Sequence, residues 1–148
     1  MTSLKKISIA SDHAGFSLKK KLIDFFKNSF EFIDHGTFSE ESADYPDFAH
    51  KIASNTLEDE ISGVLICGSG IGMSIVANRY KNVRAALCLN ENMARLSREH
   101  NNANILVLGS RLISEDEAIK CFTMFFKTKF EGGRHQARLR KFNHIESE

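Results

Sequence analysis

The sequence predicts an α/β protein, a single Rossmann-like three-layer domain built on a five-stranded parallel sheet. Short apolar runs alternate along the chain with amphipathic segments of helical period, the order that repeated strand–helix units produce. The uncharged run 64–67 is typical of a strand buried on both faces. Glycines at 68, 70 and 72 follow this run and lead into a helical segment, so a strand ends here in a tight turn.

The composition is that of one ordinary globular domain spanning residues 1–148. The chain is 42% apolar and 26% charged, and its net charge of +1 provides no broad cationic surface for nucleic acid or a membrane. It has no apolar run long enough to span a bilayer and no apolar leader segment. Its 3 cysteines form no Cys-x-x-Cys pair, and its 6 histidines form no His-x-x-x-His pair. We therefore expect a cytoplasmic protein without a disulfide framework or a metal cluster.

The other elements follow from the same two patterns. The helix beginning near Asp44 has Pro46 in its first turn, a position that proline tolerates. Over 16–28, Leu18, Leu22, Phe25 and Phe26 are expected to form the buried face. The three lysines at 19–21 are expected on the solvated face. The full set of expected strands is 6–10, 30–34, 64–67, 84–89 and 105–108, and the expected helices are 16–28, 44–57, 73–79, 90–100, 114–129 and 134–145.

The expected strand order is 2-1-3-4-5, numbering the strands along the chain. In such a sheet, ligands bind beyond the carboxyl ends of the strands where the order reverses, which here is between the first and third strands. Those strands end in Asp12-His13 and in Cys67-Gly68-Ser69-Gly70. The most reactive side chains of the chain are thus predicted to converge at one edge of the sheet.

The glycine turn matches neither of two common phosphate-binding loops. A dinucleotide fingerprint requires glycine where this chain has Met73, and a Walker loop requires a Gly-Lys pair that is absent. The turn still directs free backbone N–H groups and a helix N-terminus at one point, where an anion can bind. Cys67 lies beside that point, and a helix N-terminus favours its thiolate. A tight turn with a buried structural cysteine is the alternative interpretation.

Six short motifs, in order and at matching spacing, resemble one enzyme family. They are Ser-Asp-His-Ala-Gly, Asp-Tyr-Pro, Cys-Gly-Ser-Gly-Ile-Gly, Ser-Arg-Glu-His-Asn-Asn, Gly-Ser-Arg and Gly-Gly-Arg-His-Gln-Ala-Arg. Together they resemble the type B ribose-5-phosphate isomerases over residues 5 to about 145. Relatives of that family include galactose-6-phosphate and allose-6-phosphate isomerases. Cys67 together with Met73 places the chain with the branch that uses a thiol.

The resemblance implies an aldose–ketose isomerase that interconverts ribose 5-phosphate and ribulose 5-phosphate without metal or cofactor. It implies that Cys67 is the catalytic base and that His100 opens the furanose ring. It also implies a homodimer or a dimer of dimers with shared active sites. The positions that it matches to substrate binding are Asp12, His13, Gly68, Ser69, Gly70, Ile71, Gly72, Asn101, Arg111, Arg134 and Arg138.

The C-terminal helix independently predicts an anion site. Arg134 and Arg138 are four residues apart and share one helix face, and two guanidiniums suit a phosphate dianion. Few apolar residues, namely Leu139, Phe142 and Ile145, are available to hold this helix against its own core. We therefore expect the helix to reach a neighbouring subunit.

Four alternatives to this interpretation exist at the level of sequence. A hexose-6-phosphate isomerase would use the same chemistry, and a non-catalytic anion- or nucleotide-binding module could have the same fold. His100 could simply be a cation at a helix C-terminus. The basic segment 134–141 could contact nucleic acid, but the near-neutral chain and the absence of interleaved aromatic residues oppose this.

Overall fold

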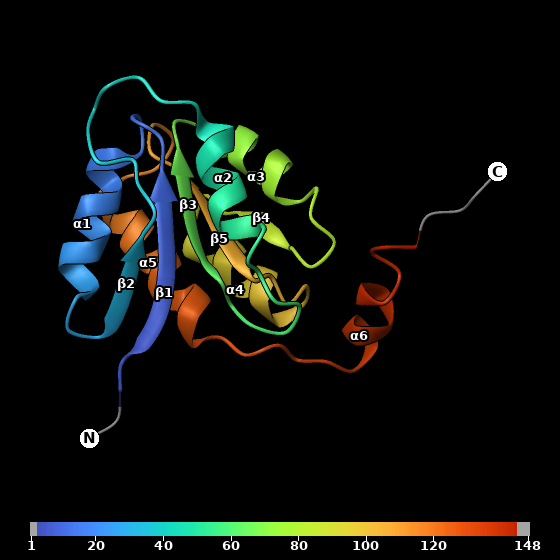
Figure 1. Ribbon diagram of the computed structural model, residues 1–148. Coiled ribbons are helices and arrows are strands. Elements are labelled where there is room, and N and C mark those ends of the chain that lie inside the picture. The colour runs from blue at the N-terminus through green and yellow to red at the C-terminus, as the bar shows by residue number, and fades with distance from the viewer. Residues whose placement is uncertain (1–2, 145–148) are drawn as a thin grey trace.

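The computed structural model describes residues 3–144, in which helices cover both faces of an all-parallel sheet (Figure 1). None of the helices in this part of the chain is both long and apolar enough to cross a membrane. The strands are β1 (Lys5–Ser11), β2 (Phe30–Asp34), β3 (Gly63–Cys67), β4 (Ala85–Leu87) and β5 (Ile105–Gly109). The helices are α1 (Phe16–Phe26), α2 (Tyr45–Ala53), α3 (Ile71–Ala77), α4 (Glu91–Glu99), α5 (Glu115–Lys127) and α6 (Arg134–Leu139).

Two apolar cores, one on each face of the sheet, make the three layers. Successive strand side chains point to opposite faces, so neighbouring residues of β3 enter different cores. Val64 and Ile66 pack with residues of α1, α4 and α5. Leu65 and Cys67 pack with residues of α2 and α3, which lie together on the other face (Figure 1). The predicted α/β class and three-layer architecture are confirmed.

The strand order is β2-β1-β3-β5-β4, so the predicted order of the last two strands is wrong. Every residue of β5 is buried, and the strand pairs with β3 on one side and β4 on the other. The three residues of β4 are only half-buried. A continuous Ile-Leu-Val-Leu run suits a central strand, whereas the shorter Ala-Ala-Leu run suits an edge. The reversal point between β1 and β3 is unaffected.

The buried face of α1 is rotated from the predicted one. Leu18, Leu22 and Phe26 are buried as expected, but Phe25 is 61% exposed. Lys19 is fully buried instead, and its ammonium lies 2.6 Å from the carboxylate of Asp34 at the end of β2. Successive residues of an α-helix are about 100° apart around its axis. Lys19 and Phe25 therefore lie on opposite sides of the buried face, which is centred on Leu22. A small rotation therefore explains both differences.

The helix α6 stands away from the sheet (Figure 1). It ends at Leu139 and is followed by a turn, whereas the sequence predicted a helix over 134–145. Position 145 lies outside the described residues. In the turn that follows the helix in the chain, the Asn143 side chain donates to the Lys81 carbonyl oxygen at 2.9 Å. The two positive-φ glycines before it, Gly132 and Gly133, turn the chain into the helix.

Candidate functional site

The carboxyl ends of β1 and β3 meet beside an open pocket of about 580 Å³. The two strands pair directly, with Ser11 opposite Ile66. The predicted convergence of their ends is therefore confirmed, and it lies where the strand order reverses. The residues that line the pocket are Asp12, Tyr45, Cys67, Gly68, Ser69, Ile71, Gly72, Ile75, Arg111 and Leu112.

Cys67 is the last residue of β3, and it lines the pocket although the residue is only 4% exposed. Its Sγ accepts a hydrogen bond from the Gly70 N–H at 3.2 Å. Gly70 has a φ of +77°, and a Cβ at this position would lie 2.4 Å from Leu87. Only glycine therefore allows the turn that directs this N–H at the sulfur.

Arg111 enters the pocket from the turn after β5. Its backbone N–H donates to the Gly68 carbonyl oxygen, and the Ser110 N–H donates to that of Cys67, both at 2.9 Å. Gly68 leaves the space that this side chain uses, because a Cβ there would lie 2.9 Å from Nη1 of Arg111. The turns after β3 and β5 are therefore tied together, and they place a permanent positive charge near the thiol.

Asp12 is buried at the end of β1, and His13 follows it. The Asp12 Oδ1 accepts from the Gly15 N–H at 3.1 Å, which holds the carboxylate at the start of α1. The ring of His13 contacts the backbone of Ala43 through Nδ1 at 3.1 Å. Asp12 lines the pocket with Cys67, whereas His13 lies at the same sheet edge outside the lining.

Tyr45 is a pocket residue that the sequence analysis did not identify as one. Its ring fills the space beside Gly72, where a Cβ would lie 2.4 Å from a ring carbon. The sequence placed Tyr45 at the start of a helix and within the Asp-Tyr-Pro motif, but it assigned the residue no role. A large aromatic residue in the exposed first turn after a long loop was the available signal.

Cys88 and Cys121 are buried core residues, as the sequence predicted. Burial raises the pKa of the Cys88 thiol to about 11 and that of the Cys121 thiol to about 12. Neither residue lines the pocket. Cys67 is therefore the cysteine whose position suits chemistry.

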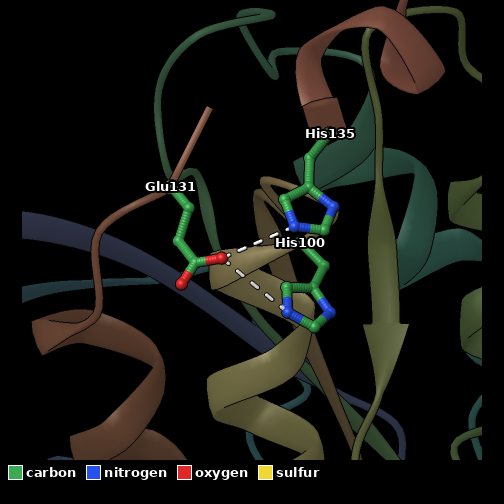
Figure 2. Close-up of side chains that lie close together, drawn as sticks. All are labelled: His100, Glu131 and His135. Carbon is green, nitrogen blue, oxygen red and sulfur yellow. Dashed lines mark ion pairs between the residues drawn. The ribbon is translucent and has the colours of Figure 1, made fainter. Parts of the chain in front are cut away.

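A second group of candidate side chains lies at the C-terminal end of α4. The imidazoles of His100 and His135 are stacked, with ring centroids 4.3 Å apart and an interplanar angle of 13°. The Glu131 Oε1 lies 3.8 Å from Nε2 of His100 and 3.5 Å from Nε2 of His135 (Figure 2). One carboxylate oxygen thus faces two stacked rings. Sequence reasoning placed His100 in the site but identified neither partner.

The two predicted phosphate ligands of α6, Arg134 and Arg138, accompany this second group. Both are exposed, and His135 between them is buried. Burial lowers the pKa of His135 below its ordinary value. The charges of His100, Arg134 and Arg138 also lower this pKa, whereas Glu131 raises it. This edge of the molecule therefore carries positive charge that a bound anion would neutralise.

Asn101 lies apart from Cys67 as well. It is exposed and lines a separate pocket of about 420 Å³ with Arg84 and Phe142. Cys67 pairs with Gly109 at the carboxyl end of β5, whereas His100 and Asn101 precede Ile105 at its amino end. The strand between them spans four steps of roughly 3.3 Å, on the order of 13 Å. Within one chain, the predicted site residues therefore form two separate groups.

The His100–Glu131–His135 group also has the donor types of a transition-metal site. The three ligand atoms all lie within 4.8 Å of one another. Two imidazoles and one carboxylate could hold such an ion. The guanidiniums of Arg134 and Arg138 lower the pKa of His135, and the same positive charges oppose a cation there. The arrangement favours an anionic ligand.

The fold and the first group define a class of protein. It is a parallel α/β domain whose pocket combines a thiol, a carboxylate and a guanidinium at the reversal point, which suits chemistry on a small anionic substrate. A profile of the ribose/galactose isomerase family matches residues 7–142. The chain belongs to this family.

Individual relatives agree with this assignment. The structure superposes on a ribose 5-phosphate isomerase from Thermotoga maritima with a TM-score of 0.90 and 52% identity, covering 95% of this chain and 99% of that one. A Mycoplasma genitalium ribose-5-phosphate isomerase B, solved with bound ribulose-5-phosphate, matches with a TM-score of 0.83 and 43% identity over 92% of each chain. The ribose-5-phosphate isomerase B of Escherichia coli is 39% identical over 97% of both chains.

Proposed function

We propose that this chain interconverts ribose 5-phosphate and ribulose 5-phosphate through an enediolate, a step of the pentose phosphate pathway. The observation that carries the proposal is Cys67 on the pocket wall, with the Gly70 N–H donating to its sulfur. An aldose–ketose shift requires a base that takes a proton from one carbon and returns it to its neighbour. The M. genitalium relative with bound ribulose-5-phosphate supports this substrate class.

In this mechanism the Cys67 thiolate removes the C2 proton of the open-chain aldose. The electron pair of the C2–H bond forms the C1–C2 double bond of the enediolate as the C1=O double bond opens. A proton passes from the C2 oxygen to the C1 oxygen, and the Cys67 thiol then gives its proton to C1 as the C2=O bond forms. Negative charge develops on the carbonyl oxygen. Backbone N–H groups of the turn 68–72 can donate to it, apart from those of Gly70 and Ile71, which donate to Cys67 and Ser69. Asp12, His13 and Arg111 hold the substrate at the same sheet edge. These groups are fixed before substrate arrives, so little reorganisation is needed.

The second group serves the pocket of a neighbouring subunit in this proposal. His100 opens the furanose ring, Asn101 contacts the enediolate oxygen, and Arg134 and Arg138 bind the phosphate. Two observations support this division. The group lies at the opposite sheet edge from the Cys67 of its own chain. In addition, α6 carries exposed guanidiniums and stands away from its own sheet. A homodimer, alone or paired into a dimer of dimers, would combine the two groups.

A reducing compartment suits this chemistry. All three cysteines are free thiols, and oxidation of Cys67 would remove the base. We therefore place the enzyme in the cytoplasm.

A coupled assay tests the proposed substrate. Initial rates are measured with ribose 5-phosphate, allose 6-phosphate and galactose 6-phosphate, and ribose 5-phosphate is expected to have the highest kcat/KM. A higher kcat/KM for either hexose phosphate would assign the chain to hexose metabolism with the same mechanism. Binding of all three sugars without turnover would indicate a binding module.

A further inference from the structure

Glu131 is the charged residue of the second group to which the proposed mechanism assigns no role. Its backbone N–H donates to the Glu99 carbonyl oxygen at 3.0 Å, which fixes the residue against the last turn of α4. His100 is the next residue after that turn. The carboxylate is 51% exposed, so it is not needed to fill a core. Its position relative to His100 is nevertheless set by the fold.

The glycines at 132 and 133 bring a second histidine to the same carboxylate. Both have positive φ angles, +72° and +56°, and they turn the chain so that α6 begins at Arg134. His135 then lies over His100 with its Nε2 directed at Glu131 (Figure 2). The side chain of His135 is only 8% exposed. Glu131 and His135 thus lie on either side of one glycine turn, and both face His100 at the end of α4.

The effect of the Glu131 carboxylate on the two imidazoles follows from the charges around them. Two imidazoles stacked at 4.3 Å repel each other when both carry a proton, and Arg134 and Arg138 add to that repulsion. Glu131 supplies the opposing negative charge on the Nε2 side of both rings. A carboxylate on the Nε2 side of a neutral imidazole favours the tautomer with its proton on Nε2 and its lone pair on Nδ1.

We propose that Glu131 is a positioning residue that holds the His100 proton on Nε2 and so presents Nδ1 as the base for ring opening. The inference rests on the proposed isomerase function. Nδ1 accepts the proton of the C1 hydroxyl as the C1=O bond forms and the bond from C1 to the ring oxygen breaks. The same proton is then delivered to the ring oxygen. One proton moves between two substrate oxygens, and no co-reactant is consumed.

The free protein tests the positioning role without any turnover. In protein labelled with ¹⁵N-histidine, the Nδ1 and Nε2 shifts of His100 and His135 are followed against pH, with assignments from single His→Gln variants. The neutral wild-type His100 ring is expected as the Nε2–H form. Glu131→Gln should weaken that preference and should move the His135 titration to lower pH, because the charge that raises its pKa is gone. Unchanged shifts and titration in Glu131→Gln would overturn the proposal.

Kinetics then test whether positioning serves ring opening. Erythrose 4-phosphate cannot form a furanose, because its C4 oxygen carries the phosphate. Glu131→Gln should lower kcat/KM for ribose 5-phosphate by roughly 10- to 100-fold, as loss of a supporting carboxylate does elsewhere. The same variant should leave kcat/KM for erythrose 4-phosphate nearly unchanged. Equal losses on both substrates would show a role outside ring opening and would contradict the proposal.

Two further variants provide the controls. Glu131→Asp keeps the charge and should restore part of the activity on ribose 5-phosphate. Glu99→Gln removes a neighbouring carboxylate that pairs with Arg95, and it should behave as wild type in both experiments. If wild-type protein turns over neither sugar, the proposed function fails, whereas the histidine titration still decides the role of Glu131.

Discussion

The pocket edge of the sheet, at the carboxyl ends of the strands, and the opposite edge, at their amino ends, are built in different ways. At the pocket edge, close packing fixes the backbone, since a Cβ at Gly70 or Gly72 would lie 2.4 Å from a neighbouring side chain. At the opposite edge, Gly132 and Gly133 have no atom within 4 Å of such a Cβ. Cys67 is buried, whereas Arg134 and Arg138 are exposed.

This difference separates two tasks. The pocket edge resembles a preorganised catalytic centre, in which the thiol and its hydrogen-bond donor keep one geometry. The opposite edge presents cations on a helix that has little of its own chain to rest on. A second surface would supply what this edge lacks, and the following predictions test that comparison, from the largest effect to the smallest.

Mixing two inactive variants tests whether the two edges act together. Cys67→Ala should lower activity by about 10²- to 10⁴-fold, the usual contribution of an acid–base group. Arg134→Ala/Arg138→Ala should also be nearly inactive, because it lacks the phosphate contacts. Co-expressed chains that form dimers at random should regain about a quarter of wild-type activity, since half of the dimers contain one intact site.

The control for this experiment is each variant mixed with itself, which should stay inactive. Cys88→Ala and Cys121→Ala should remain active, because their thiols lie outside the pocket. No recovery in mixed dimers of confirmed composition would show that each chain builds its own complete site.

Removing α6 should separate binding from folding. A chain that ends at Phe130 loses both guanidiniums, and each charge-assisted contact to a phosphate contributes roughly 1.5–3 kcal/mol. Substrate binding by calorimetry should weaken by at least about 100-fold, and dimerisation in sedimentation should weaken with it. The circular dichroism of the sheet and the other helices should persist. Unchanged substrate affinity would exclude α6 from the site.

Alanine substitutions in the two glycine turns compare the rigidity of the two edges. Gly70→Ala should destabilise the fold by about 2–4 kcal/mol, because it combines a left-handed φ with displacement of Leu87. Gly132→Ala adds only the strain of the positive φ, about 1–2 kcal/mol. Urea denaturation of both variants measures the contrast. Equal losses would mean that the opposite edge is packed as tightly as the pocket edge.

The smallest expected effect is that of pH on α6. Burial and neighbouring cations lower the pKa of His135 in the folded protein. The unfolded segment therefore takes up a proton more readily as the pH falls below about 6.5, and folding of this segment becomes less favourable. Above that pH the effect vanishes. The protection factors of the α6 amides, which are exchange rates corrected for the intrinsic pH dependence of exchange, should fall on acidification in wild type more than in His135→Gln, and an identical fall in both would refute this assignment.

Local features of the fold could be predicted from sequence because their causes are local. The apolar run 64–67, the glycines after it and Pro46 each specify one strand, turn or helix start. The convergence of Asp12 and Cys67 followed from the parallel direction of β1 and β3 and from their expected adjacency in the sheet. Neither prediction required knowledge of which strand lies at the edge.

Features that depend on packing between distant segments were missed. The positions of β4 and β5 depend on which strand has neighbours on both sides, and the sequence order does not specify this. Glu131 stands 31 positions after His100, and only the turn that follows α5 brings them together. Tyr45 becomes a pocket residue because α2 packs against α3 and places the ring over Gly72. Such contacts belong to tertiary structure rather than to a motif.

Because the two groups lie at opposite ends of β5, the specific activity of the enzyme should depend on its concentration. If one site needs Cys67 from one chain and Arg134 from another, an isolated chain is folded but inactive. Specific activity would then depend on protein concentration and fall once dilution favours monomers. Substrate bound across two chains would oppose that dissociation, so a dilute enzyme should be more active after preincubation with the sugar phosphate. Few copies per cell would thus reduce flux more than in proportion to their number.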